Sequence, residues 1–310
     1  MGLLNSFDPL ETDKLFGYAK NFDFLKNLIS RERFPSVLML TGNKGIGKCT
    51  FVSHFLHYYY DKIHYNYVEK SFLSKSSFHI QFKENVFPNV FYLSSSNQKI
   101  TIDEIRNLKV KLSKSSINNL KRFIIIDEIE SLNLNCLNGL LKIIEEPNNK
   151  DHFILINNKN KSLLETVKSR SLELKIFLEK KENDEITNSL VEHFNQDVLF
   201  DYNLVTTSPG NFIKYNHLFI EKNIDISDDF LKNLNKILNL YKKEKSFYFK
   251  DLLIYFTDYY LQNNLSKLSL SNKNFIESRH FIIKNINDYF LYNLNQNTLI
   301  NSIENKFINE

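Results

Sequence analysis

Short apolar runs and helical repeats alternate along the first half of the chain. Apolar runs lie at 36–41, 90–93, 123–126 and 153–156, and each has the length expected of a buried strand. Between them, apolar residues recur at helical spacing in 49–60, 101–112 and 134–146, and Pro147 ends the last of these helices. Strands that alternate with helices predict an α/β fold, in which helices cover both faces of a parallel sheet.

The pattern changes near residue 175, beyond which we find no strong strand signal. Amphipathic segments at 182–194, 227–241, 251–261 and 275–294 predict helices, and Ser227 is the expected cap of the second. We therefore divide the chain into an α/β domain at 1–175, a small helical region at 176–225 and an all-α C-terminal domain at 226–310. The Ser-, Lys- and Phe-rich segment 70–83 is predicted to be a loop.

Composition narrows the class of protein only a little. The 310 residues, 42% hydrophobic and 25% charged, suit a globular protein of two or three units. A net charge of +4 permits contact with nucleic acid without requiring it. Two cysteines cannot form a four-ligand zinc site, and the histidines at 54, 57 and 64 lack partners at metal-binding spacing, so no metal site is expected. Cys49 and Cys136 are interpreted as reduced thiols of a cytoplasmic protein. No apolar run approaches roughly 18 residues and no signal sequence is evident, so no membrane span and no secretion are expected.

The strongest motif is a glycine-rich loop at 42–48, GNKGIGK, which follows a predicted strand and opens a predicted helix. This is the context of a Walker A loop, whose backbone N–H groups surround phosphates while the lysine contacts the outer ones. The candidate nucleotide-binding residues are Gly42, Gly45, Gly47 and Lys48.

The loop departs from the motif directly after its lysine. A working Walker A loop places a Ser or Thr hydroxyl on Mg²⁺ at this position, whereas this chain has Cys49. A thiol is a poor ligand for a hard cation that prefers oxygen. Thr50 comes one residue late, about 100° around the helix. We expect weak or absent nucleotide binding; a tolerated substitution in a working ATPase is the alternative.

A second motif lies downstream, where the apolar run at 123–126 ends in Asp127 and Glu128. This is the Walker B pattern, in which a buried strand directs Asp toward Mg²⁺ and Glu toward the attacking water. The pair supports a P-loop fold without proving activity, because Asp127 can persist as a structural partner of the loop.

Further motifs resemble one family. Residues 137–147, LNGLLKIIEEP, resemble the NALLKTLEEPP signature of bacterial clamp-loader subunits, which are AAA+ proteins. Residues 15–18, LFGY, resemble the family's N-terminal LIGH element, and 167–171, VKSRS, resemble its SRC motif. Asn157 falls at the family's sensor 1 position. The resemblance covers about 8–175; beyond it, only 207–210, TSPG, resembles a family element, the GSPG of the lid.

The departures favour the delta-prime type of subunit, a stator, over the ATP-hydrolysing gamma/tau motor. Cys49 breaks Walker A, and Gly210 stands where motor subunits carry the sensor 2 arginine. The four-cysteine zinc module found in many subunits of both types is missing, which discriminates weakly. The resemblance makes 176–225 the lid and 226–310 the collar that assembles the DNA polymerase III clamp loader.

In the family, the SRC arginine reaches into a neighbour's ATP site, so the resemblance implies that Arg170 is an arginine finger acting in trans. The alternative is a surface arginine that caps a helix end. The implied partners are the gamma/tau and delta subunits, the sliding clamp, and primer-template DNA within the complex. No cofactor is required by a stator, and ATP with Mg²⁺ in this subunit is doubtful. The alternatives left open are a gamma/tau-like motor, another AAA+ ATPase and a direct DNA-binding module.

Overall fold

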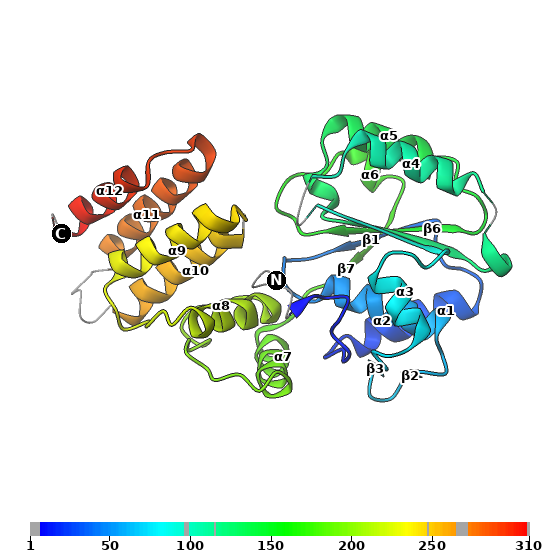
Figure 1. The fold of residues 1–310 in the computed structure, drawn as a ribbon, viewed down its shortest axis with the longest axis horizontal. Helices are drawn as coiled ribbons and strands as arrows, with labels where there is room; N and C mark the ends of the chain where they lie inside the picture. Colours follow the sequence, from blue (N-terminus) through cyan, green and yellow to red (C-terminus); the bar gives the residue numbers. More distant parts are fainter. Residues whose placement is uncertain (1–6, 96–98, 115, 247, 265–271, 309–310) are drawn as a thin grey trace. The chain divides into compact units, whose positions relative to one another are not determined.

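The computed structural model describes residues 7–95, 99–114, 116–246, 248–264 and 272–308. The chain forms two compact units (Figure 1). Unit 1 comprises Met1–Leu190 with Ser208–Gly210, and unit 2 comprises Val191–Thr207 with Asn211–Glu310. The division into domains at 1–175, 176–225 and 226–310 stays a prediction.

Unit 1 is built on a five-stranded sheet in which every pairing is parallel, as the alternating pattern predicted. The strand order is β4-β5-β6-β1-β7. The strands are β4 (Val90–Ser94), β5 (Arg122–Asp127), β6 (Asp151–Asn157), β1 (Val37–Thr41) and β7 (Leu172–Lys175). The four expected strands are therefore confirmed, whereas the edge strand β7 was not predicted.

Helices cover both faces of this sheet (Figure 1). One face carries α1 (Ala19–Ser30), α2 (Lys48–Tyr60) and α3 (Ser77–Lys83), and the other carries α4 (Ile102–Leu112), α5 (Leu134–Ile144) and α6 (Glu165–Lys168). Alternation along β1 supplies both cores, because Leu38 and Leu40 pack with α1 and α2 while Val37 and Met39 pack with α4 and α5. Short 3-10 helices at Ile117–Asn119 and Ile129–Ser131 flank β5.

The segment 70–83 is structured, so the loop prediction was wrong. Strand β3 (Ser71–Phe72) pairs antiparallel with β2 (Tyr65–Asn66), and α3 follows. The Ser76 hydroxyl caps α3 by accepting a hydrogen bond from the His79 N–H at 3.2 Å. Phe78 and Phe82 lie one turn apart and are both buried. The helix therefore forms because its apolar face is buried against α2, which the Ser- and Lys-rich composition concealed.

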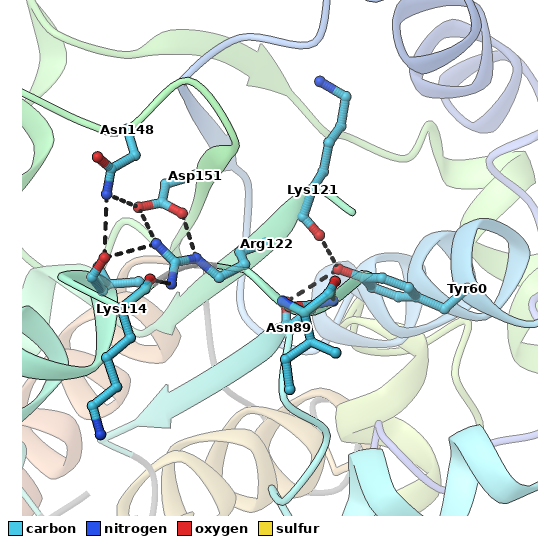
Figure 2. Close-up of polar contacts among 9 residues, drawn as sticks. Tyr60, Asn89, Lys114, Lys121, Arg122, Asn148 and Asp151 are labelled. Carbon is cyan, nitrogen blue, oxygen red and sulfur yellow. Dashed lines mark hydrogen bonds and ion pairs between the residues drawn. The ribbon is translucent and has the colours of Figure 1, made fainter. Parts of the chain in front are cut away.

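A buried ion pair joins the starting ends of β5 and β6 (Figure 2). The Arg122 guanidinium donates to both carboxylate oxygens of Asp151, at 2.6 and 2.9 Å, and also to the carbonyls of Leu112 and Lys114. Asn148 donates to the same carboxylate at 3.1 Å. The two charges are thus compensated in the interior, at the end of the sheet opposite the glycine-rich loop.

In the described part of unit 2, the regular secondary structure is helical, as expected for the C-terminal region. The helices of this region are α7 (Lys180–His193), α8 (Pro209–Glu221), α9 (Phe230–Glu244), α10 (Tyr248–Asn263), α11 (Asn272–Tyr292) and α12 (Gln296–Ile308), of which α7 and α8 begin in unit 1. The predicted cap was wrong, because Asp229 caps α9. The helix expected at 275–294 corresponds to α11, which ends at Tyr292. Helix α12 was not predicted. Within the described ranges, no helix has both the length and the apolar character needed to cross a membrane.

Candidate nucleotide-binding site

The predicted Walker A, Walker B and sensor 1 residues meet at one edge of the sheet of unit 1. β1 leads into the glycine-rich loop, β5 ends at Asp127, and β6 ends at Asn157. These strands are parallel neighbours, so their carboxyl ends share an edge. The Gly42 N–H donates to the Asn157 carbonyl at 3.1 Å, which ties the start of the loop to the end of β6. The sequence predictions about location are therefore consistent with the structure.

Glycine is required at three positions of the loop. Gly45 and Gly47 have φ of 82° and 91°, in the left-handed region that side chains disfavour. A Cβ on Gly42 would lie 2.2 Å from the Ile176 carbonyl oxygen. Gly47 is also the N-cap of α2. The loop therefore keeps the backbone shape of a phosphate-binding loop that opens a helix.

Lys48 turns back onto its own loop. Its ammonium donates to the carbonyls of Gly42 and Asn43 at 2.8 and 2.7 Å, and only 3% of the residue is exposed. Burial lowers the pKa of Lys48 to about 8, and the opposite charges of Asp127 and Glu130 limit the decrease. The cation that would meet the outer phosphates is thus bound to backbone oxygens.

Asp127 has a partner on each carboxylate oxygen. Oδ2 accepts from the Tyr92 hydroxyl at 3.0 Å, and Oδ1 accepts from the Glu128 N–H at 2.9 Å. Burial raises the pKa of Asp127 to about 6, although the Tyr92 hydrogen bond opposes this increase. The Cys49 sulfur lies 3.5 Å from the same Tyr92 hydroxyl. One tyrosine therefore joins the two positions at which P-loop proteins hold Mg²⁺.

Glu128 is paired with a lysine of the glycine-rich loop. Its carboxylate lies 3.1 Å from the Lys44 ammonium. The residue is 9% exposed and has φ of 58°, in the left-handed region. The pair therefore places a cation beside the carboxylate that the Walker B pattern assigns to the attacking water.

Asn157 and Thr50 are less informative. The Asn157 side chain accepts a hydrogen bond from the Lys159 N–H at 2.9 Å, within its own turn. Thr50 follows Cys49 in the first turn of α2 and is half-buried. The sensor 1 function of Asn157 stays a prediction.

Arg170 lies just beyond α6. Its guanidinium donates to the Thr166 carbonyl at 3.1 Å and pairs with Glu145 at 2.9 Å. About a third of its side chain, 38%, is exposed. The bond to Thr166 is the helix-end contact that the alternative interpretation expected, so the arginine finger stays a prediction.

The metal that a P-loop fold implies does not fit this donor set. Mg²⁺ takes oxygen ligands in near-octahedral geometry, whereas the chain offers the Cys49 thiol and a carboxylate whose two oxygens are already hydrogen-bonded. Elsewhere in the described part of the chain, no group of three or more His, Cys, Asp or Glu residues is arranged to hold a metal ion.

Tyr92 and Tyr18 are site residues that the sequence did not indicate. The Tyr18 hydroxyl donates to the Ile46 carbonyl of the glycine-rich loop, and Tyr92 joins Cys49 to Asp127. Tyr92 lies in β4, which carries no recognised motif. The one feature that could have identified it is a polar hydroxyl on a strand that pairs with the Walker B strand. Tyr18 lies in the element that resembles LIGH, but nothing in that element indicated a contact with the loop.

Comparison with known proteins identifies the family. A family model described as DNA polymerase III, delta subunit, matches residues 17–179, which is more than half of the chain. The chain belongs to this family.

A 95-residue stretch is 30% identical to the DNA polymerase III subunit delta' of Buchnera aphidicola subsp. Baizongia pistaciae, and it covers 31% of this chain and 28% of that protein. A 171-residue stretch is 29% identical to the subunit delta' of Buchnera aphidicola subsp. Schizaphis graminum, and it covers 50% of this chain and 49% of that protein. The chain thus spans about half, or less, of the lengths of these relatives.

A solved structure supports the fold. A DNA polymerase III gamma subunit-related protein from Thermotoga maritima has a TM-score of 0.50 and 16% identity, and the match covers 92% of this chain and 98% of that one. At this identity, the likeness shows a shared fold and nothing about activity.

Proposed function

We propose that the chain is a delta-prime-type, non-motor subunit of the DNA polymerase III clamp loader. It would assemble with gamma/tau and delta subunits and help to load the sliding clamp on primed DNA during replication. Family membership over 17–179 and the relatives named subunit delta' support this proposal. Primer-template DNA would be met within the complex.

The observation that carries the non-motor assignment is the state of the Walker A loop. Position 49 lacks a hydroxyl, the Lys48 ammonium is bound to loop carbonyls, and Glu128 is paired with Lys44. A motor needs these groups for metal, phosphate and water, respectively. The subunit would therefore need no cofactor, and ATP chemistry would belong to its neighbour.

The contribution to that chemistry would come from Arg170. A planar guanidinium supplied in trans stabilises charge on a transferring phosphoryl group, and such fingers contribute about 10³ to 10⁵ in rate in GTPases. Arg170 is partly exposed, and its in-chain partner Glu145 is 45% exposed. Ion pairs at such positions contribute only about 0–1 kcal/mol, so the guanidinium can be released to a neighbouring site.

The test is the DNA- and clamp-stimulated ATPase rate of a loader reconstituted from cognate motor and delta subunits. The wild-type chain should raise this rate, whereas Arg170→Ala should assemble equally, by gel filtration, and lose at least about tenfold of the stimulation. Arg106→Ala is the matched control, because Arg106 is also an exposed arginine in an ion pair, with Asp103 at 2.9 Å. Equal stimulation by Arg170→Ala would exclude the finger, and failure of the wild-type chain to assemble would refute the clamp-loader assignment.

One observation favours a motor as the second candidate. Lys48, Asp127 and Glu128 are all retained at the edge of the sheet. A motor predicts ATP turnover by the isolated chain that is lost in Glu128→Ala, whereas the non-motor proposal predicts no turnover in either protein.

A further inference from the structure

Tyr92 holds a position that no motif assigns. It lies in β4, opposite Ile125 of β5, and its hydroxyl reaches both Cys49 at the start of α2 and Asp127 at the end of β5. In P-loop proteins, the residue after the Walker A lysine and the Walker B aspartate both serve the metal ion. The hydroxyl therefore contacts the side chains at the two positions that would serve a bound Mg²⁺.

The direction of the hydrogen bonds follows from the proton count. A tyrosine hydroxyl has one proton and two lone pairs, and an ionised carboxylate only accepts. Tyr92 therefore donates to Asp127, and the Cys49 S–H donates to the Tyr92 oxygen. A tyrosine hydroxyl has an ordinary pKa of about 10, so it keeps its donor proton at neutral pH.

The backbone of Tyr92 is fixed as well. β4 is an edge strand, and on its open side the Asn85 side chain takes the place of a neighbouring strand. The Tyr92 N–H donates to Asn85 Oδ1 at 3.2 Å, and Asn85 Nδ2 donates to the Tyr92 carbonyl at 3.1 Å. The ring is also packed against the core beneath α2. The hydroxyl is thus held in place by bonds at both ends of the residue.

We propose that the Tyr92 hydroxyl replaces the metal ion of this P-loop, so that Cys49 and Tyr92 together exclude Mg²⁺ and the nucleotide it accompanies. A neutral proton donor satisfies Asp127 where a motor subunit would use a divalent cation. Restoring a hydroxyl at position 49 alone leaves this donor in place and leaves the site closed. The inference rests on the proposed non-motor function and deepens it.

The experiment measures binding of a fluorescent ATP analogue to the full isolated chain, in excess Mg²⁺ and in EDTA. The variants are Cys49→Thr, Tyr92→Phe and the double variant, with a second double variant that carries Tyr92→Leu in case the phenylalanine ring still fills the space. Tyr60→Phe combined with Cys49→Thr is the matched control. Tyr60 also lies on the α2 side of the sheet, but its hydroxyl donates to the carbonyls of Asn89 and Lys121 (Figure 2).

Wild type, the two single variants and the Tyr60 control should bind equally weakly with and without Mg²⁺. At least one Tyr92 double variant should bind about tenfold more tightly with Mg²⁺ than with EDTA. The proposal is overturned if Cys49→Thr alone gains this dependence, or if folded double variants, judged by thermal melting, gain none. The measurement requires neither assembly nor Arg170, so its failure is distinguishable from failure of the clamp-loader function.

Discussion

Two histidines of α2, His54 and His57, are fully buried in unit 1. His57 stacks on Phe72, with ring centroids 3.8 Å apart, and its nitrogens face the Ser53 carbonyl and His79. His54 faces the Thr12 carbonyl and the Tyr65 hydroxyl. Burial lowers the pKa of His54 to about 3 and of His57 to about 4. Both are therefore neutral in the folded state at neutral pH.

These histidines should make unit 1 sensitive to acid. As the pH falls below about 6.5, these two histidines become protonated in the unfolded chain but stay neutral in the folded chain. Their full contribution to the free energy of unfolding is therefore present above that pH and decreases toward pH 4. Each histidine should remove at most about 1.4 kcal/mol per pH unit from the free energy of unfolding. Urea unfolding from pH 7 to 4.5 measures the slope.

Two variants separate this effect from general acid sensitivity. His57→Leu and His54→Leu should each flatten the slope, because each removes an imidazole whose burial lowers its pKa. Equal slopes for wild type and His57→Leu would refute the explanation.

Side-chain direction was the part of the site that sequence could not supply. Lys48, Asp127 and Asn157 could be placed together, because each adjoins a buried strand of a parallel sheet. The Tyr92 contact depends on the register of β4 against β5, where Ser94 and not Tyr92 lies opposite Asp127. A single sequence does not determine that register.

At the scale of elements, helix α9 shows how a cap is chosen. Asp229 Oδ1 accepts from the N–H groups of Leu231 and Lys232, at 2.9 and 3.1 Å. Ser227, the predicted cap, instead donates its hydroxyl to Asp225. Both residues have a side chain suited to capping. The preceding turn engages Ser227 with Asp225 and leaves Asp229 at the N-cap.

Asp229→Ala should therefore lower the free energy of unfolding by about 1 kcal/mol, because two N–H groups lose their acceptor. Ser227→Ala, the matched control, should have an effect within about 0.5 kcal/mol. Chemical denaturation followed by circular dichroism measures both values. A larger loss for Ser227→Ala would show that the cap lies where the sequence first indicated.

Elements with a strong apolar pattern were predictable, and those without one were not. β7, with the sequence LELK, is an edge strand whose residues are largely exposed, so it lacks the buried run that identified the other four. α3 was missed because five polar residues surround its first phenylalanine, although tertiary packing buries one face. In α3 packing overrides local composition, whereas β7 is held by parallel pairing with β1.

For the whole molecule, the charge balance limits what the isolated chain can bind. It has 40 Lys and Arg against 36 Asp and Glu, which gives +4. Many of these charges are paired on the surface, as in the pairs that Asp228 makes with Lys232 and Lys236. Affinity for DNA depends on the number of phosphates that a protein neutralises.

The isolated chain should therefore bind primer-template DNA only at the level of nonspecific contacts, with a Kd no tighter than about 10⁻⁶ M at physiological salt. Fluorescence anisotropy over a series of salt concentrations measures both affinity and salt dependence. Tight binding with a steep salt dependence would instead support a direct DNA-binding module.

The strand order of unit 1 also has a consequence for biosynthesis. β1 lies between β6 and β7, yet it leaves the ribosome first, and its partners begin only at Asp151 and Leu172. At about 5–20 residues per second, this apolar strand waits on the order of ten seconds before either neighbour is translated. During that interval the apolar strand VLMLT has neither of its pairing partners, so it is a segment to which a cotranslational chaperone would bind.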